Sequence, residues 1–454
     1  MSDKAGLTLI FDIGKTNKKV LLFDNSLKLI YQEETSFVET TDDDGFLCDD
    51  FDKIELWLQD KIISLIKSEK FNITKINFTT YGATLVYLDK EGKRLTPVYN
   101  YLKPLGADVD ELIFKKWGGK NEFLRKTASP ALKMLNSGFQ ILKLRQEKAD
   151  IFKNIEHILH LPQYLSFLLT KKITSEATSI GCHTALWDYD NMKYHDWLKS
   201  EGIKLPKPID NSMSFPTIIE GKQIELGIGI HDSSASLVPY LMGSSEEFVL
   251  VSTGTWCINM NPFNNEPLTD IELKNDCLSF LTYQQKPVKS SRVFLGHIHD
   301  VNIKKINDFF NVPVDAYKTL AMNTNLLKAL LAKSKQVRVF FKNGIPDNYI
   351  DEQIDLAIFE NFEHCYYQFI IDLAYIVSDS INLIINSKQK IKHLYITGGF
   401  ARNKQFTHTL ASINNQQSVF TSEIDNATAL GAALVLNNNM NNNINLGLNK
   451  VEII

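Results

Sequence analysis

Hydrophobic and polar positions near the start of the chain alternate in blocks that predict paired strands. Two apolar runs, at residues 7–13 and 20–24, flank the polar segment GKTNKK, an arrangement that is typical of a β-hairpin. Farther along, INFTTYGATLVYLDKEGKRLTPVY predicts a strand, a loop at residues 80–83, a second strand, a turn at residues 90–92 and a third strand. Between these groups, FDKIELWLQDKIISLIKSEK has apolar residues at helical spacing, so we expect an amphipathic helix there.

The middle of the chain changes character twice. Residues 105–200 carry amphipathic helical segments such as GFQILKLRQEKADIF, whereas residues 205–225 contain Pro206, Pro208 and Pro216 and predict a connection. After it, ELGIGIHDSSASLVPYL predicts a strand, a turn and a helix, and EEFVLVSTGTWCINMNPF predicts a strand, a polar turn and a strand. The second of these segments repeats the layout of the first hairpin about 240 residues later, which indicates an internal duplication.

The C-terminal part is predicted to alternate helices and strands. A long helix is expected over residues 350–387, and KHLYITGGFARNKQFTHTLAS predicts a strand, a glycine turn and a helix. The small-residue segment DNATALGAALVL predicts a further helix. The Asn-rich end, LNNNMNNNINLGLNK, has low complexity and is expected to be solvated or poorly ordered.

The composition is that of a soluble globular protein, with 44% hydrophobic and 22% charged residues among 454, a length that allows two or three domains. The net charge of −4 gives no electrostatic reason to expect nucleic acid or an anionic membrane as a partner. The five cysteines are scattered without a CxxC pair, which favours reduced thiols over disulfides or a zinc site. The sequence has neither a leader-like start nor an apolar run of bilayer length, so we expect no signal peptide and a cytoplasmic location.

The first polar turn has the residue types of a phosphate and magnesium site. Gly14 permits close backbone approach to a ligand, and Asp12, at the end of the strand, is a carboxylate that can hold Mg²⁺ through water. Neutral donors and cations that suit phosphate oxygens follow: Lys15, Thr16, Asn17 and Lys19. The alternative is a hairpin with a solvated cationic turn.

Two later turns combine glycine with polar groups. Around Gly254 and Thr255, STGTW offers hydroxyls and backbone N–H groups for a phosphate cradle, with a Thr/Gly hairpin as the alternative. In TGGFARN, Gly398 and Gly399 leave bare backbone on which a flat group can lie, and the next helix adds positive charge at its N-terminus. An ordinary glycine turn is the alternative there. The chain has no Walker or Rossmann glycine pattern, so a nucleotide would bind by other means.

The segment GIHDS places an acid directly after an apolar strand and at the start of a helix. Asp232 can be the general base that takes the proton of a substrate hydroxyl during phosphoryl transfer, or it can be only a helix N-cap. His231 beside it can hydrogen-bond a polyol, or it can be a structural histidine.

The order of these motifs resembles that of the FGGY family of carbohydrate kinases. DxGxTxxK begins at residue 12, HD at residue 231, SxGTW at residue 252 and GGxxxN at residue 398. The resemblance runs from about residue 7 to residue 434 and includes HILHLPQYLSFLLTKKITSEATSIGCHTALWD and DNATALGAAL.

The resemblance implies an α/β fold of two ribonuclease-H-like domains, as in actin, Hsp70 and sugar kinases, around a central cleft. We expect an N-terminal, sugar-binding domain at residues 1–240 and a C-terminal, ATP-binding domain at residues 241–454. By resemblance, Asp232 is the catalytic base and Asp12 orders magnesium. The implied ATP contacts are Gly14, Lys15, Thr16, Asn17, Lys19, Gly254, Thr255, Gly398, Gly399 and Asn403.

Within the family, the His-Asp pair and the segment TSIGCHTALWD look most like the rhamnulokinase and fuculokinase branch. The implied reaction is ATP-dependent phosphorylation of a 6-deoxyketohexose, such as L-rhamnulose or L-fuculose, to its 1-phosphate. The chain has Lys15 where most members have Thr, and VYNYLKP where they have a Trp-containing segment, so the identity of the sugar is left open. The expected sugar contacts are Thr80, Tyr81, Gly82, Asn100, His231 and Asp232. Tyr101 could stack on the sugar or belong to the core.

Two other functions stay open at this level. The same chemistry could act on another ketose or polyol, such as xylulose or ribulose. A non-kinase ATPase of the same superfold, a switch or filament, is the alternative from a different class, although such a protein has no hydroxyl substrate for the His-Asp turn to serve. Sugar and ATP are the expected small-molecule partners, without nucleic acid or membrane, and a homodimer is left open.

Overall fold

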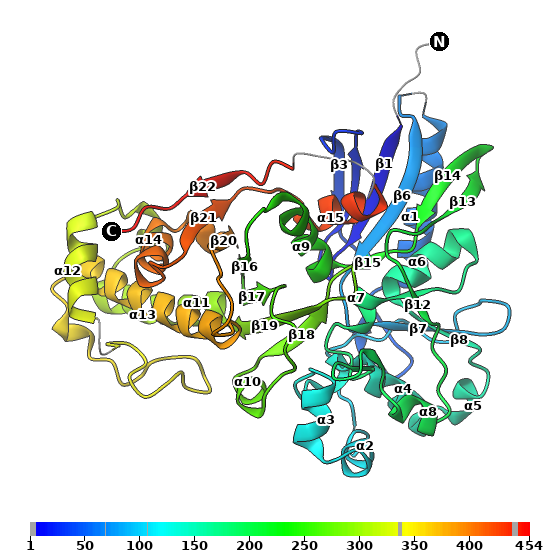
Figure 1. Ribbon diagram of the computed structural model, residues 1–454, viewed down its shortest axis with the longest axis horizontal. Coiled ribbons are helices and arrows are strands. Elements are labelled where there is room, and N and C mark those ends of the chain that lie inside the picture. Colours follow the sequence, from blue (N-terminus) through cyan, green and yellow to red (C-terminus); the bar gives the residue numbers. More distant parts are fainter. Residues whose placement is uncertain (1–5, 69, 107, 335–337, 438–443) are drawn as a thin grey trace.

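The computed structural model describes residues 6–68, 70–106, 108–334, 338–437 and 444–454. The described chain forms two lobes, each built on a mixed seven-stranded sheet with helices on its faces (Figure 1). The lobe at the N-terminal end of the chain carries the first sheet, and the lobe at the C-terminal end carries the second.

The first sheet joins strands from the beginning of the chain to strands that follow residue 213. In spatial order it consists of β13 (Ser214–Ile219), β14 (Lys222–Gly227), β6 (Ile73–Thr80), β1 (Leu7–Ile13), β2 (Lys18–Phe23) and β3 (Leu29–Thr35), with β15 (Ile230–His231) also paired to β6. β1 is antiparallel to β2 and parallel to β6, and both β14 and β15 run parallel to β6. The hairpin predicted from the first two apolar runs is confirmed.

The second sheet repeats this arrangement. In spatial order it consists of β18 (Leu278–Leu281), β19 (Pro287–Val293), β17 (Cys257–Asn261), β16 (Phe248–Thr253), β20 (His393–Gly398), β21 (Ser418–Ser422) and β22 (Leu448–Lys450). β16 is antiparallel to β17 and parallel to β20, which in turn runs parallel to β21. An antiparallel hairpin followed by parallel strands therefore occurs twice, as the internal duplication predicts.

Smaller elements and helices complete the two lobes. Four two-stranded sheets pair β4 (Thr40–Thr41) with β5 (Leu47–Cys48), β7 (Leu85–Leu88) with β8 (His157–His160), β9 (Ser175–Glu176) with β12 (Pro208–Ile209), and β10 (Trp187–Asp188) with β11 (Lys193–Tyr194). The helices up to residue 200 are α1 (Phe51–Lys67), α2 (Glu111–Lys116), α3 (Lys120–Lys126), α4 (Ser137–Glu147), α5 (Ala149–Phe152), α6 (Leu161–Thr170), α7 (Ala177–Ile180) and α8 (Trp197–Ser200). Those that follow are α9 (Asp232–Gly243), α10 (Asp270–Lys274), α11 (Leu295–Phe310), α12 (Thr324–Ser334), α13 (Phe362–Leu383), α14 (Lys404–Ile413) and α15 (Ala427–Leu436).

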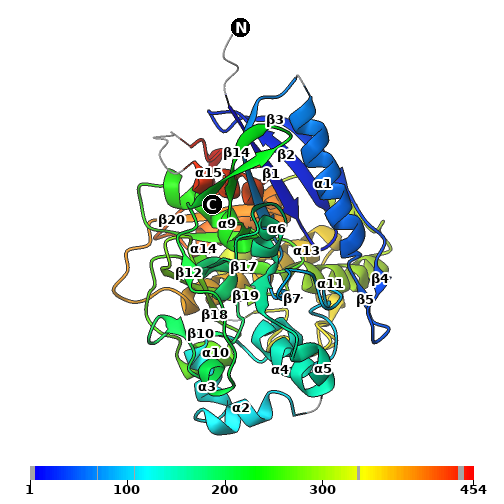
Figure 2. The ribbon, with the colours of Figure 1, turned by 90° about the vertical axis from the view of Figure 1, so that its right-hand side faces the viewer.

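The two faces of the first sheet are covered by helices from opposite ends of the chain. Along β1, Leu9 and Phe11 pack into the cluster that contains α1, whereas Ile10 packs into the cluster that contains α15, as strand alternation requires. Figure 2 shows α1 and α15 on either side of β1. The helical period of buried residues on α1 and the Asp50 side chain, which accepts a hydrogen bond from the Lys53 backbone N–H, explain where this helix forms and begins.

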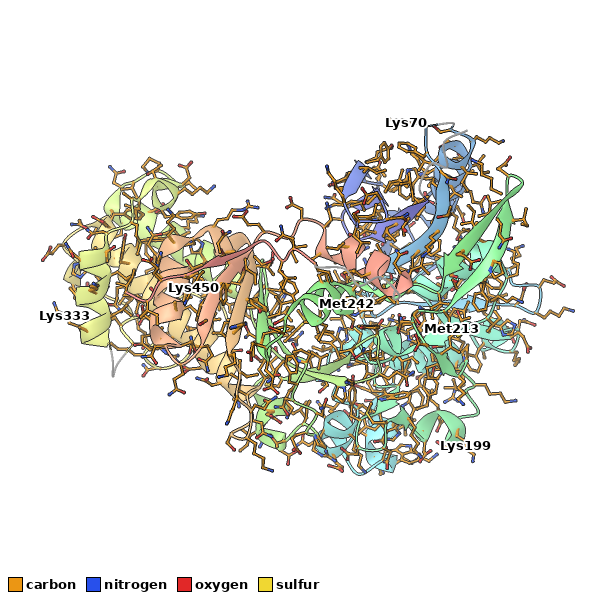
Figure 3. The ribbon with its side chains drawn as sticks, turned by 45° about the horizontal axis from the view of Figure 1, so that its top comes forward. Lys70, Lys199, Met213, Met242, Lys333 and Lys450 are labelled. Carbon is orange, nitrogen blue, oxygen red and sulfur yellow. The ribbon has the colours of Figure 1, made fainter. Side chains whose placement is uncertain are left out.

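α15 packs on the first sheet although it follows most of the second. A Cβ at Gly431 would lie 1.9 Å from the Ala235 carbonyl oxygen, so the backbones of α15 and α9 touch and only glycine fits. Asn77 on β6 donates a hydrogen bond of 2.9 Å to the Ala432 carbonyl. Met242, near the end of α9, lies between the two lobes (Figure 3). The division at residue 240 stays a prediction, and this helix crosses it.

Four expectations about secondary structure are corrected. The connection expected at residues 205–225 is largely the hairpin β13–β14, which the prolines permit because Pro216 lies in an outer strand of the sheet. In the described residues after the turn at 90–92, a single bridge between Leu88 and Arg94 replaces the third strand. The long helix expected from residue 350 begins only at Phe362, where Asn361 caps it.

The fourth correction concerns the Asn-rich end. Residues 438–443 lie outside the described residues, and of the rest Leu448–Lys450 forms the edge strand β22.

In the described part of the chain, no helix combines the length and the apolar character needed to cross a bilayer. All five cysteines are buried with free thiols.

Candidate active site

Three neighbouring strands of the first sheet end together. Asp12 on β1 is paired with Thr79 on β6, which is paired with Ile230 on β15. The first residues after the ends of these three parallel strands are Gly14, Tyr81 and Asp232. The carboxyl ends of parallel strands are where open α/β sheets bind their ligands. This edge therefore brings the two predicted functional carboxylates, Asp12 and Asp232, to the same place.

The Asp232 carboxylate is held by one of its two oxygens. Oδ1 accepts from the Ser233 backbone N–H at 2.5 Å and from the Ser233 hydroxyl at 3.2 Å, and it lies 3.1 Å from His231 Nε2. Within the part of the chain that the structure describes, no group donates to Oδ2. Burial raises the pKa of Asp232 to about 6, although 30% of the side chain is exposed. The N-cap position of α9 belongs to His231, so the N-cap alternative for Asp232 is wrong.

Asp12 is a second carboxylate with a raised pKa. Its Oδ2 accepts a hydrogen bond of 2.6 Å from the Thr428 hydroxyl at the start of α15. Burial raises the pKa of Asp12 to about 6, and the charge of Asp232 adds to the shift, while Lys19 opposes it. A half-buried carboxylate with one hydrogen-bonded oxygen and one oxygen left over, as in Asp12, fits a divalent cation, since Mg²⁺ prefers carboxylate and water oxygens.

The first polar turn divides between two surroundings. Thr16 and Asn17 are exposed, and the Gly14 N–H donates to the Asn17 carbonyl at 3.0 Å. Lys15 Nζ instead lies 2.9 Å from Glu39 and 2.8 Å from Asp49. Its charge is thus paired with two carboxylates, of which Asp49 also pairs with Lys18.

A cavity of about 780 Å³ lies beside Lys15 in the first lobe. Its wall includes Lys15, Thr16, Glu39, Asp49, Asn100 and Lys103. Tyr81 donates from its hydroxyl to Asp49 at 2.8 Å, and its ring meets the half-buried Tyr101 edge-on with centroids 5.9 Å apart. Of the predicted sugar contacts, Asn100 thus lines this cavity and Tyr81 contacts its wall.

The other predicted sugar contacts are more enclosed. Thr80 is fully buried, and its hydroxyl donates to the Tyr81 carbonyl at 2.9 Å. Gly82 is packed so closely that a Cβ there would lie 2.8 Å from His231 Nε2. Thr80 and Gly82 thus pack against other groups of the protein at the end of β6.

A second cavity, of about 770 Å³, lies in the second lobe and is lined by most of its predicted nucleotide contacts. Gly254, Thr255, Gly399 and Asn403 are all in its wall. Asn403 caps α14 by accepting from the Phe406 N–H at 3.0 Å, which leaves the start of this helix at the cavity.

Thr253 joins the two glycine turns of this cavity. Its hydroxyl donates to the Thr397 carbonyl at 2.5 Å and accepts from the Phe400 N–H at 3.0 Å. Gly398 has φ +85°, and a Cβ on it would lie 1.7 Å from the Thr253 carbonyl oxygen, so glycine is required here for packing. A Cβ on Gly399 would meet no atom of the described residues within 4 Å, so this position faces open space.

Sequence reasoning missed the aromatic wall of this cavity. His299 and Tyr317 line it with ring centroids 4.9 Å apart, and Phe400 lies 5.4 Å from His299. No local pattern in the sequence indicates this wall, because it depends on the packing of α11 on the STGTW turn. A Cβ at Gly296, at the start of α11, would lie 2.6 Å from the Gly254 carbonyl oxygen.

Comparison with known proteins gives one family for the first lobe. Residues 7–229 match the model described as "FGGY family of carbohydrate kinases, N-terminal domain". The chain is 25% identical over 273 residues to a rhamnulokinase of Yersinia pestis, and this alignment covers 57% of this chain and 54% of the relative. It is 24% identical over 258 residues to a rhamnulokinase of Halalkalibacterium halodurans, with 54% and 52% covered. The chain thus spans about half the length of the curated relatives it matches.

Solved structures resemble the whole chain. A carbohydrate kinase from Novosphingobium aromaticivorans aligns with a TM-score of 0.81 at 22% identity, covering 99% of this chain and 95% of that one. A xylulose kinase from Lactobacillus acidophilus aligns with a TM-score of 0.77 at 16% identity, covering 98% and 93%. These similarities confirm the predicted fold of two domains of the actin and Hsp70 type. Residues 7–229, which include most of the first lobe, thus match the N-terminal domain of the FGGY family of carbohydrate kinases.

Proposed function

We propose that this protein transfers the γ-phosphoryl group of ATP to a primary hydroxyl of a ketose. The observation that carries the proposal is the Asp232 carboxylate, whose Oδ1 is held by neighbouring donors while Oδ2 accepts from no described group at the carboxyl edge of the first sheet. A free carboxylate oxygen with a pKa of about 6 is ionised at neutral pH and can accept the hydroxyl proton as the new P–O bond forms.

ATP binds, in this proposal, mainly to the domain at residues 241–454. The cavity of the second lobe is large enough for the adenosine, with Gly399 and Asn403 beside it and the Gly254–Thr255 turn at its rim. Thr16 and Asn17, exposed at the opposite lobe, offer neutral donors to the terminal phosphates once the lobes close. Closure also excludes water, which would otherwise compete with the sugar hydroxyl.

Magnesium fits the same edge. Asp12 would hold it, through water, with Asp232 close by, and a bound divalent cation neutralises charge on the phosphates. The Thr428 hydroxyl fixes the Asp12 carboxylate, which leaves its Oδ1 for the cation shell.

The sugar occupies the domain at residues 1–240 in this proposal, beside Tyr81, Tyr101 and the cavity that Asn100 lines. The rhamnulokinase relatives favour a 6-deoxyketohexose such as L-rhamnulose or L-fuculose, with its 1-phosphate as product. Similarity to a xylulose kinase structure keeps xylulose or ribulose as the second candidate class. The five buried free thiols suit a reducing compartment, and we place the reaction in the cytoplasm.

A ketose panel with coupled ADP detection tests this function. We expect ADP release only when sugar is added, with the highest kcat/KM for one 6-deoxyketohexose and strong rejection of analogues that lack its hydroxyls. A maximum on xylulose or ribulose would select the second class. Sugar-independent ADP release would identify an ATPase of the same superfold, and no ADP release with any sugar would contradict the kinase proposal.

A further inference from the structure

His231 is enclosed rather than exposed to a ligand. Its side chain is 4% exposed, and Cys182 Sγ lies 3.1 Å from Nε2. The Phe280 ring of the second lobe lies 6.0 Å away at an angle of 31°. A Cβ at Gly82 would come within 2.8 Å of Nε2 and 2.9 Å of Cys182 Sγ, so the backbone of the loop at residues 80–83 covers the ring. A sugar hydroxyl cannot reach Nε2 without displacing this shell.

The surroundings fix which ring nitrogen carries the proton. Burial lowers the pKa of His231 to about 3, so the ring is neutral and has a single N–H. Nε2 lies 3.1 Å from the Asp232 carboxylate, where a lone pair would oppose a lone pair. Nδ1 is buried and has no partner among the described residues, so a proton there would be an orphaned donor. The proton therefore belongs on Nε2, which donates to Asp232 Oδ1.

We propose that His231 is a positioning residue: its Nε2–H holds Oδ1 of Asp232 so that Oδ2 alone faces the acceptor hydroxyl. This inference rests on the proposed function, because it assigns Asp232 the role of the base. It replaces the sugar contact predicted for His231 with a role that acts through Asp232. The neutral ring orients the carboxylate without the full charge that would make it a weak base.

Several features of the site follow from this arrangement. The Ser233 hydroxyl and N–H hold the same oxygen, so three donors converge on Oδ1. Gly82 is required because any side chain would push the imidazole away from Asp232. Cys182 is a buried thiol whose raised pKa keeps it neutral, and its sulfur is a weak second acceptor for Nε2–H.

The kinetic test compares two variants. His231→Leu removes the donor, whereas His231→Gln keeps an N–H at nearly the position of Nε2. With the best sugar of the panel, we expect His231→Leu to lower kcat by about 10- to 100-fold, as for other misplaced catalytic groups, with little change in the KM for sugar. His231→Gln should recover most of that loss. A rise in the KM for sugar with kcat unchanged, in either variant, would make His231 a sugar contact and overturn the inference.

A second measurement needs no activity. Long-range ¹H–¹⁵N spectra of the ¹⁵N-histidine-labelled protein, with the His231 signals assigned by their loss in His231→Gln, show which ring nitrogen is protonated. We expect the Nε2–H tautomer, unchanged down to about pH 5. A protonated Nδ1 in the neutral ring would overturn the inference even if the kinase proposal holds. A wild-type protein that has this tautomer but no sugar-dependent ADP release would instead contradict the proposed function.

Discussion

The Thr428 hydroxyl donates a hydrogen bond of 2.6 Å to Asp12 Oδ2, although 416 positions separate the two residues in the chain. Through this contact, the first turn of α15 reaches the end of β1. Asn426, at the N-cap of the same helix, lies 3.2 Å from Lys19 Nζ. α15 therefore helps to shape the carboxyl edge of the first sheet, where the two carboxylates of the proposed mechanism lie.

Ionised Asp12 should lower the stability of the folded protein. Its pKa rises from 3.8 unfolded to about 6 folded because of burial, so its charge destabilises the folded state above pH 6, and the cost disappears as pH falls toward 4. After discounting for its partial exposure, we expect Asp12→Asn to stabilise the metal-free protein by about 1–2 kcal/mol at pH 8. Urea unfolding at pH 8 and pH 4 measures this gain. A stabilisation that is equal at both pH values would exclude this charge as its source.

Turnover should fall in acid. The base must be ionised to accept a proton, and the pKa of Asp232 is about 6. We predict that kcat/KM for sugar declines about tenfold for each unit below pH 6, with a plateau between pH 7 and 8. Initial rates at saturating ATP, in buffers of constant ionic strength, measure the profile. An activity that stays flat to pH 5 would disagree with the raised pKa.

The two neighbouring glycines of the second lobe should respond differently to substitution. Gly398→Ala would force a methyl group into the Thr253 carbonyl at a positive φ, so we expect a lower Tm and loss of soluble protein. At Gly399 a Cβ would meet no atom of the described residues within 4 Å and the position lines the cavity, so for Gly399→Leu we expect an unchanged Tm and about tenfold weaker ADP binding. Calorimetric titration with ADP, without sugar, separates these effects. Unchanged ADP affinity in Gly399→Leu would remove this cavity from the nucleotide site.

Lys15 and Lys19 form a matched pair that separates the sugar side from the nucleotide side. Lys15 lines the cavity that also contains Asn100, whereas Lys19 lowers the pKa of Asp12 through its charge. We expect Lys15→Ala to raise the KM for sugar by about threefold or more and to leave the KM for ATP within about twofold. Lys19→Ala should show the reverse pattern. A selective rise in the KM for ATP in Lys15→Ala would instead support the original prediction that Lys15 contacts the phosphates of ATP.

Local patterns in the sequence were sufficient for the strand-and-turn framework of the site. Asp232 follows an apolar strand and begins a helix. The apolar runs at residues 7–24 and 248–261 are sufficient to predict the two hairpins there. These features depend on spacing between near neighbours, so the sequence alone predicts where the strand ends and their polar turns occur.

Long-range packing was beyond such reasoning. The partners of Lys15 come from positions 24 and 34 residues away, so no local pattern shows that this lysine pairs with Glu39 and Asp49. The small residues of α15 predict a close helix contact, but not that the contact is with α9 on the first sheet. The enclosure of His231 depends on Gly82, Cys182 and Phe280, which three separate segments supply.

The most direct test of the central claim is the Asp232→Asn variant, which keeps the shape of the side chain and removes its basicity. We predict that sugar-dependent ADP release falls by about 10³-fold or more, while ADP affinity measured by calorimetry stays within about twofold of that of the unmodified protein. Turnover within about tenfold of normal would contradict Asp232 as the base, and with it the proposed mechanism.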